Sequence, residues 1–362
     1  MSTTERAIDI VRDLAIYHED ISIDVSHALM RLAANYRPHG PLIKQKIFEY
    51  EAKHQKPFYL SNEKRLDLCI GQSAVGKLHH EGKQLKARQG YVKGEVNAFS
   101  VETSDQAVAV GSYVEDMKAF LAACGEMADS VLVKFGDEAL DKAEMLLGPV
   151  FVKSRPIGGQ GIVLKLNTAR HWDNLDPSDF HLWGEKDDNV VWRGQPTGTH
   201  ENRSLPWDDN VRLNFVKNYS ANYDVGFSKL GPQGDKICEP FVKGVLGKKE
   251  QLKSKYVVSL EGNDVATNLK WILASNSVPI MPHPTFESWL LESQLIPYVH
   301  YVPLSDGLDD LDEVYAWCLS NDEHCRRIAE NGKRYMEMFF DEANEKEMCR
   351  MIYKKYKSMV EG

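Results

Sequence analysis

One segment in the C-terminal half of the chain combines residue types suited to binding phosphate. It spans residues 255–271, where an apolar stretch leads into a glycine and polar side chains and then into a helical pattern. Gly262 is able to take a positive φ, and Asn263 or Asp264 suits the N-cap of the following helix. A helix N-terminus at the carboxyl edge of a parallel sheet is where a diphosphate binds, although an ordinary capped turn uses the same residue types. The candidate residues of this turn are Glu261, Gly262, Asn263 and Asp264.

A second segment, residues 191–203, offers positive charge. It follows an apolar stretch and places small and hydroxylated residues between two arginines. A guanidinium makes bidentate contacts with phosphate oxygens, while surface ion pairing is the commoner role of any single arginine. The candidate residues of this segment are Arg193, Gly194, Thr197 and Arg203.

Two further carboxylates stand at the ends of predicted elements. Asp137 follows Gly136 after the apolar run 131–135, a place where aspartate is often only a turn former. Glu287 lies at the start of a predicted helix, where it suits holding ribose hydroxyls as an acceptor-only group, with helix-dipole compensation as the alternative. The acidic pairs lack the DxD spacing of a metal site and the histidines form no zinc-like ligand set, so we expect no metal.

A third pattern, at residues 71–78, nearly spells a phosphate-binding Walker loop, because it reads GQSAVGKL after an apolar stretch. The hydroxyl residue that holds magnesium in such loops is replaced by Leu78, and no convincing strand ending in aspartate supplies a second metal partner. The pattern therefore favours a coincidental glycine-containing loop, and an ATP-dependent kinase or ligase that uses residues 71–77 is kept as the alternative hypothesis.

These residues need a sheet to bring them together at one edge. Periodicity predicts strands at 131–135, 150–152, 190–192, 256–260, 278–281 and 298–303. Helices are predicted over 2–35, 265–275, 286–292, 309–320 and 322–340, with an amphipathic helix closing the chain. Strands that alternate with helices of this length imply a parallel sheet. The loop-rich run 167–188 is typical of an interdomain connection, so we place the main boundary near residue 175.

Length and composition indicate a folded protein of two domains. The chain has 362 residues, of which 43% are hydrophobic and 27% charged, and this exceeds the usual size of a single core. The net charge of −9 argues against a nucleic-acid partner, because phosphate-backbone binding needs clustered lysine and arginine. Six cysteines without CxxC spacing indicate reduced thiols, and the N-terminus has no signal-peptide pattern. We therefore expect a cytoplasmic protein, with peripheral association at the inner face of the membrane.

The motifs of the C-terminal half, taken in order, resemble those of glycosyltransferase family 90. The resemblance rests on WRG followed by an arginine, on SLEGNDVATNLKWILASNSVPIMP, on FESW, and on PYVHYVPL with an acidic helical stretch after it. It runs from about residue 131 to residue 340, and the first 125 residues contribute little to it. The family includes fungal capsule-associated xylosyltransferases, animal protein O-glucosyltransferases and bacterial lipopolysaccharide core transferases, of which the bacterial branch fits best.

The resemblance implies an α/β fold of the GT-B type, in which two Rossmann-like domains face a central cleft. We expect an acceptor-side domain over 1–175, a donor domain over 176–341, and a terminal helix at 342–362 that packs back on the first domain. The resemblance further implies a hexosyl- or pentosyltransferase that uses a nucleotide sugar, a UDP-sugar, as co-substrate and inverts the anomeric centre without cofactor or metal. The expected acceptor is a surface glycan or glycolipid, such as lipopolysaccharide core or capsule.

Individual roles also follow from the resemblance. The family's base is an aspartate upstream of a PVF strand, and Asp137 precedes PVF at 149–151 by a similar interval, so Asp137 is the expected base. Arg203 is the expected catalytic cation at the diphosphate. Eukaryotic members commonly carry an arginine where this chain has Asn268, so the cationic donor contact is either missing here or supplied by Lys270, and both Asn268 and Lys270 are candidate donor-binding residues. A non-catalytic glycan-binding module is a further alternative.

Overall fold

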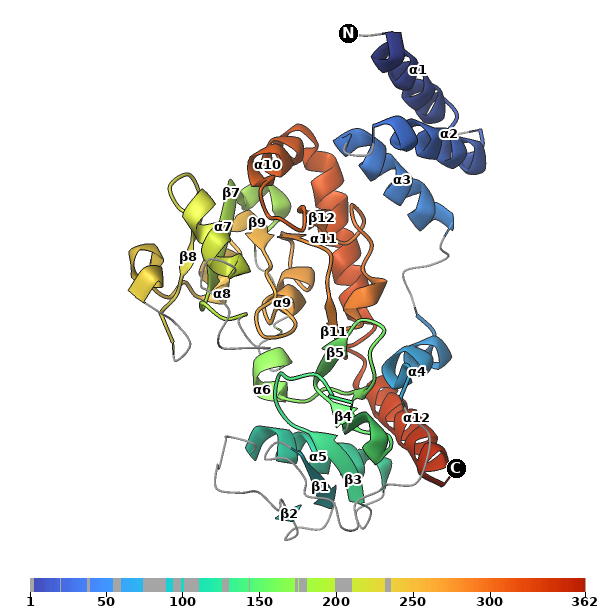
Figure 1. Cartoon of the computed structure of the whole chain (residues 1–362), viewed down its shortest axis with the longest axis vertical. Coiled ribbons are helices and arrows are strands. Elements are labelled where there is room, and N and C mark those ends of the chain that lie inside the picture. The colour runs from blue at the N-terminus through green and yellow to red at the C-terminus, as the bar shows by residue number, and fades with distance from the viewer. Residues whose placement is uncertain are drawn as a thin grey trace.

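The computed structural model describes residues 3–19, 21–37, 40–54, 60–73, 89–93, 99–100, 111–125, 130–142, 144–172, 175, 181–198, 210–231 and 236–361. Within these ranges, two five-stranded sheets and a two-stranded ribbon are surrounded by helices (Figure 1). The α/β class predicted from the alternation of strands and helices is confirmed. No helix in the described ranges combines the length and the apolar composition that crossing a bilayer requires.

The first sheet has the strand order β2-β1-β3-β4-β6. Strand β1 runs antiparallel to β2 and β3, whereas β3, β4 and β6 run parallel to one another. The predicted strands β3 and β4 form because Val131, Val133 and Phe151 are apolar and are buried within the sheet. The strands are β1 (Gln89–Lys93), β2 (Phe99–Ser100), β3 (Ser130–Lys134), β4 (Phe151–Val152) and β6 (Ile162–Val163).

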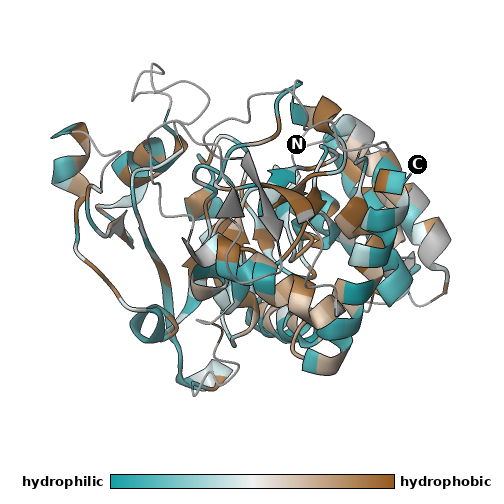
Figure 2. Ribbon diagram, turned by 90° about the horizontal axis from the view of Figure 1, so that it is seen from below, coloured by the Kyte–Doolittle hydropathy of each residue, from teal (hydrophilic) through white to brown (hydrophobic). Residues whose placement is uncertain are grey.

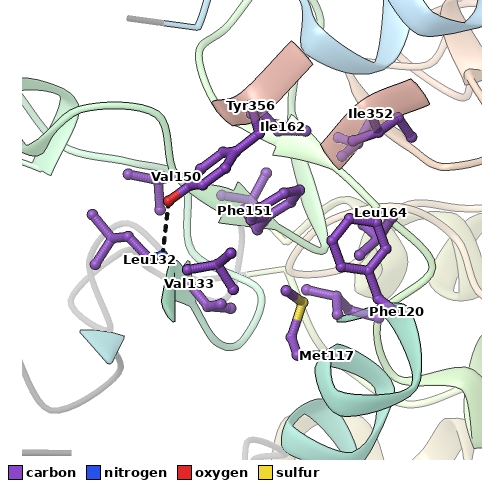
Figure 3. Close-up of a cluster of buried hydrophobic side chains, with 14 of the residues drawn as sticks. Met117, Phe120, Leu132, Val133, Val150, Phe151, Ile162, Leu164, Ile352 and Tyr356 are labelled. Carbon is purple, nitrogen blue, oxygen red and sulfur yellow. Dashed lines mark hydrogen bonds between the residues drawn. The ribbon is translucent and has the colours of Figure 1, made fainter. Parts of the chain in front are cut away.

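The C-terminal helix α12 (Glu342–Glu361) completes the core of the first sheet (Figure 3). The ring of Tyr356 lies 4.8 Å from that of Phe151, and the Tyr356 hydroxyl accepts a hydrogen bond from the backbone N–H of Leu132 at 3.2 Å. The apolar face predicted for this helix is confirmed, since its inward residues are buried. The other helical segments in this part of the chain are α4 (Asn62–Ile70), α5 (Gly111–Cys124), η1 (Glu144–Leu147) and α6 (Thr168–His171).

The second sheet has the order β12-β10-β9-β7-β8, and all its strand pairs are parallel. The strands predicted at 190–192, 256–260 and 278–281 are confirmed in β7, β9 and β10. Sequence patterning missed β8, because it is a four-residue strand at the sheet edge and too short to show an alternation. The strands are β7 (Asp187–Gly194), β8 (Asp224–Phe227), β9 (Ser254–Val258), β10 (Val278–Met281) and β12 (Val302–Pro303).

Helices surround the second sheet, and Figure 2 shows hydrophobic residues gathered towards the interior, with hydrophilic residues on the outer helix surfaces. The helices predicted over 309–320 and 322–340 are confirmed in α10 and α11, while the one predicted over 265–275 is shorter and begins only at Leu269. The α-helices are α7 (Val211–Tyr219), α8 (Lys248–Gln251), α9 (Leu269–Leu273), α10 (Leu311–Ser320) and α11 (Asp322–Glu337). The 3₁₀ segments are η2 (Trp183–Glu185), η4 (Lys236–Phe241) and η5 (Glu292–Gln294).

A short antiparallel ribbon of β5 (Ser154–Pro156) and β11 (Phe286–Ser288) lies between the two sheets (Figure 1). The helix predicted over 286–292 is therefore wrong. In the ribbon, Arg155 stands opposite Glu287, and the two side chains form a buried ion pair at 2.8 Å. Pairing with a distant strand overrides the local helical pattern, because strand preference depends mostly on cross-strand packing.

The first three helices, α1 (Thr3–Tyr17), α2 (Ile23–Tyr36) and α3 (Pro41–His54), form a separate small cluster. The single helix predicted over 2–35 is interrupted, because Ser22 caps the N-terminus of α2 by accepting from a backbone N–H. Gln45 of α3 accepts a hydrogen bond from the Trp317 indole at 2.9 Å, so this cluster rests on α10.

Candidate active site

A cleft of about 390 Å³ is lined by residues from both sheets. Asp137 and Lys153 follow β3 and β4 on one side, and the loops after β7 and β9 provide the other side. The carboxyl ends of parallel strands from both sheets thus meet at the cleft, which is where α/β proteins bind their ligands. The predicted site residues that line the cleft are Asp137, Arg193, Gly194, Thr197, Gly262, Asn263, Asp264 and Asn268.

A buried lysine joins the two sides of the cleft. The ammonium of Lys153 contacts Oδ1 of Asp137 and lies 2.7 Å from Oδ2 of Asp264. Asp264 also accepts a hydrogen bond from the Ser154 hydroxyl at 2.6 Å. Sequence reasoning missed Lys153, because a lysine after a strand is usually exposed and nothing local signals its two partners.

The pKa values of Asp137 and Asp264 shift in opposite directions. Burial alone would raise the pKa of Asp137, but Lys153, Arg170 and the Asn263 amide hold it below its ordinary value. Burial raises the pKa of Asp264 despite the attraction of Lys153. Asp137 is therefore ionised at neutral pH, and its side chain is partly exposed to the cleft.

The turn after β9 is packed against the loop after β7. Gly262 does not take the predicted positive φ, and its lack of a side chain serves close packing instead, because a Cβ there would lie 2.4 Å from Thr197 Oγ1. Asn263 accepts a hydrogen bond from the N–H of Gly198, at 3.1 Å, rather than capping a helix. Since α9 starts at Leu269, the predicted helix N-terminus at Asn263 or Asp264 is also wrong.

Arg212, on α7, ties these loops together and was not predicted. Its guanidinium donates to the carbonyls of Gln195 at 2.9 Å and Leu260 at 2.6 Å, and to Thr197 Oγ1 at 2.7 Å. Burial lowers the pKa of Arg212 to about 10, although nearby carboxylates oppose the shift. Arg212 is therefore a cation at the wall of the cleft. Among the described residues, no carboxylate lies within hydrogen-bonding distance of its guanidinium. Its position in the first turn of α7, outside every predicted strand, gave no sequence signal.

Two predicted donor contacts that line the cleft have protein partners. The Arg193 guanidinium donates to Asp224 Oδ1 at 2.6 Å and to the Asp224 carbonyl. Both of its terminal nitrogens are therefore bonded to the neighbouring strand β8. Asn268 donates to the carbonyl of Val258 at 2.8 Å and accepts from Ser259 at 3.0 Å. Both side chains therefore make hydrogen bonds that stabilise the carboxyl edge of the second sheet.

Three further predicted residues lie outside the residues that line the cleft. Glu261 accepts from the N–H groups of Thr285 and Phe286 at 2.9 and 3.0 Å, and burial raises its pKa. Lys270 is completely buried, with its ammonium 3.1 Å from Glu292. The carboxylate of Glu287 forms an ion pair with the buried Arg155 guanidinium. Arg203 lies outside the described residues.

The short helix α6 adds two residues to the cleft that sequence patterning did not suggest. Arg170 is exposed there and acts electrostatically on Asp137. His171 is buried, which lowers its pKa, so its imidazole is neutral at physiological pH. Asp116 of α5 fixes the start of α6 by accepting from the N–H of Thr168 at 2.9 Å.

The Walker-like pattern has the wrong context for a phosphate loop. Its apolar lead-in is helix α4, which ends at Ile70 with Gly71 as its C-cap, whereas a P-loop follows a strand. Gly71 packs against the Arg155 guanidinium, and residues 74–80 lie outside the described residues. Among the residues that are described, no group of three or more His, Cys, Asp or Glu side chains is arranged to hold a metal ion.

Comparison with known proteins identifies the class of this α/β protein. The model of the family described as Glycosyl transferase family 90 matches residues 171–359. The chain therefore belongs to glycosyltransferase family 90, as the motif resemblance predicted.

Named relatives agree with this assignment. The chain is 35% identical over 218 residues to O-glucosyltransferase LpsA of Dichelobacter nodosus, covering 59% of this chain and 63% of the relative. It is 27% identical over 154 residues to Protein O-glucosyltransferase 2 of Danio rerio, covering 42% of this chain and 29% of the relative. It is 34% identical over 82 residues to Protein O-glucosyltransferase 3 of Rattus norvegicus, covering 22% of this chain and 16% of the relative. The chain thus spans less than two thirds of each of these relatives.

Proposed function

We propose that this protein is a glycosyltransferase, which moves a hexosyl or pentosyl group from a UDP-sugar to a hydroxyl of a glycan acceptor, with inversion at the anomeric carbon. The observation that carries the proposal is the cleft in which an ionised, partly exposed Asp137 faces glycine-containing loops and Arg212. Relatives named O-glucosyltransferases favour glucose as the transferred sugar and a hydroxyl oxygen as the acceptor atom.

In the proposed reaction, Asp137 removes the proton of the acceptor hydroxyl while that oxygen attacks the anomeric carbon. The bond to the nucleotide diphosphate breaks on the opposite face, and negative charge develops on the departing diphosphate. Arg212 and the backbone around Gly262 stabilise that charge, since a cation and close backbone approach suit phosphate oxygens. Arg203 remains the proposed additional cation. The residues supply these functions without a metal ion.

The two sheets suggest how the substrates are divided. We assign the nucleotide sugar to the side built by β7, β9 and α7, and the acceptor to the side built by β3 and β4. This assignment corresponds to a GT-B arrangement, with an acceptor-side domain over 1–175, a donor domain over 176–341 and a returning helix over 342–362. The packing of α12 against Phe151 supports the last assignment. The proposed acceptor is a surface glycan or glycolipid, such as lipopolysaccharide core or capsule, reached from the cytoplasmic side of the membrane.

The deciding experiment measures nucleotide release by the purified chain with UDP-glucose, UDP-galactose and UDP-xylose, with and without a lipopolysaccharide-core acceptor and with EDTA. We expect release from one UDP-sugar, stimulation by the acceptor, and no inhibition by EDTA. Thermal stabilisation by UDP provides an independent reading, because a ligand that binds only the folded state raises Tm. Stabilisation by ATP-magnesium alone, without any UDP-sugar turnover, would contradict the proposal and favour a kinase or ligase.

A further inference from the structure

Arg170, in the last turn of α6, is a cation of the cleft to which the proposed reaction gives no role. Its side chain is exposed and lines the cleft. Among the described residues, no hydrogen bond or ion pair holds its guanidinium, although it acts electrostatically on Asp137. A guanidinium that is free in a ligand cleft offers two parallel N–H donors to the oxygens of an anion.

The charged side chains that line the cleft leave an excess of positive charge. Four lining cations stand against two lining carboxylates. The cations are Lys153, Arg170, Arg193 and Arg212, and the carboxylates are Asp137 and Asp264. His171 adds no charge, because burial lowers its pKa and keeps the imidazole neutral. A cleft with this balance attracts anionic ligands.

The other three lining cations have partners or a proposed ligand. Lys153 lies between two carboxylates, and Arg193 is paired with a carboxylate on the neighbouring strand. Arg212 donates to backbone carbonyls on the donor side and is proposed above to face the diphosphate. Within the described part of the chain, Arg170 is therefore the lining cation that is left for a further anion.

The helix that carries Arg170 is anchored to the side of the cleft that we assign to the acceptor. Asp116 of α5 accepts from the N–H of Thr168 at 2.9 Å and also from its hydroxyl. Asn167 donates to the hydroxyl of Tyr113, on the same helix, at 3.3 Å. Helix α5 packs into the core of the first sheet. The Arg170 guanidinium therefore belongs to the same side of the cleft as the proposed base.

We propose that the acceptor is an anionic sugar, and that Arg170 binds its carboxylate or phosphate group. The inference rests on the proposed function, because it takes Asp137 as the base and the first-sheet side as the acceptor side. An acceptor whose hydroxyl lies at Asp137 presents its neighbouring substituents to this part of the cleft. Arg170 is then a residue that selects anionic acceptors and orients their hydroxyl towards the base.

The test is calorimetric titration of the full chain, saturated with UDP, with three sugars that differ only in the group at carbon 6: glucuronic acid, glucose 6-phosphate and glucose. We expect at least one of the two anions to bind at least about tenfold more tightly than glucose, as for one charge-assisted contact. The tighter of the two identifies carboxylate or phosphate as the preferred group. Equal affinity for all three sugars, or binding of none of them, would overturn the proposal.

A pair of variants locates the anion contact. Arg170→Gln should reduce the affinity for the preferred anion to that for glucose, while the affinity for UDP stays native. Arg334→Gln is the matched control, because Arg334 is an exposed arginine in the last turn of α11 that does not line the cleft, and it should keep the preference for the anion. Weaker UDP binding in Arg170→Gln with an unchanged preference among the sugars would place Arg170 at the donor diphosphate and overturn the proposal.

Failure of this proposal is distinguishable from failure of the proposed function. The titrations need no turnover, so an anion preference that depends on Arg170 together with no consumption of any UDP-sugar would refute sugar transfer and leave the anion site in place. Transfer to a neutral acceptor, with equal affinity for the three sugars, would instead support sugar transfer and refute the anionic acceptor.

Discussion

The ammonium of Lys153 lies 2.7 Å from Oδ2 of Asp264, and it contacts Asp137 as well. A single buried cation therefore joins a carboxylate that follows β3 in the first sheet to one that follows β9 in the second. Burial disfavours the charge on Lys153, yet the two carboxylates raise its pKa above the ordinary value. The ion pair with Lys153 therefore fixes the position of the Asp137 carboxylate and lowers its pKa.

Replacing this cation should change the pH profile of sugar transfer. In Lys153→Met, burial of Asp137 is no longer opposed by the ammonium, so the pKa of Asp137 rises and the acid limb of the profile moves to higher pH. We expect the rate at neutral pH to fall about tenfold or more. Lys118→Met removes an exposed lysine that pairs with Glu115 at 3.1 Å, and should keep the native profile. An unchanged profile in Lys153→Met would show that this lysine does not tune Asp137.

The role of Asp137 as base is tested by Asp137→Asn, which keeps the size of the side chain but cannot accept the acceptor's proton. Transfer should fall by about 100-fold or more. UDP affinity should barely change, because the proposed diphosphate contacts come from the other side of the cleft. Glu138→Gln is the matched control, since Glu138 is the exposed neighbour. Near-normal transfer in a folded Asp137→Asn variant would exclude this residue as the base.

Gly262→Ala should weaken nucleotide binding without a backbone-strain effect. Its Cβ would lie 2.4 Å from Thr197 Oγ1 and 2.9 Å from Arg212 Nη2, so the loop after β7 must move. We expect UDP to bind about tenfold more weakly, as for the loss of one charge-assisted contact. Gly184→Ala, where a Cβ meets nothing within 4 Å, serves as the control for titration. Native UDP affinity in Gly262→Ala would remove this turn from the donor site.

Glu287→Gln separates a structural role from a donor contact. Loss of the charge leaves Arg155 buried without its partner, so the free energy of unfolding should fall by about 3–5 kcal/mol. The donor KM of the folded fraction should stay native. Glu347→Gln removes one partner of an exposed pair with Arg350, at 3.0 Å, and should cost about 0–1 kcal/mol. A raised donor KM at native stability would return Glu287 to the binding site.

His300 should make stability depend on pH. Burial lowers its pKa from 6.5 to about 3, so between these values the unfolded chain holds a proton that the folded protein does not. The free energy of unfolding therefore falls as pH drops through this window, by about 1.4 kcal/mol per unit. Urea unfolding at pH 7 and pH 5 should show a smaller difference for His300→Asn than for the native chain. An equal difference would assign the pH dependence to other groups.

The sequence by itself determined the elements whose apolar runs are long and buried. Strands β3, β9 and β10 and the inward face of α12 follow from local hydrophobic pattern, because that pattern is the main signal of secondary structure. The motif series from residue 131 onward also determined the family, and it directed attention to Asp137 and to the turn at Gly262. Both of these residues line the cleft.

Only the tertiary structure decided which polar side chains face ligand and which face protein. Glu287 and Lys270 are predicted from the sequence to contact the donor, yet each is buried against a partner of opposite charge. Lys153 and Arg212 carried no local signal, and their partners come from loops distant in the chain. A charged residue's role depends on what lies within a few ångströms of its end, because Coulomb attraction and desolvation are both short-range in effect. Sequence spacing does not contain those distances.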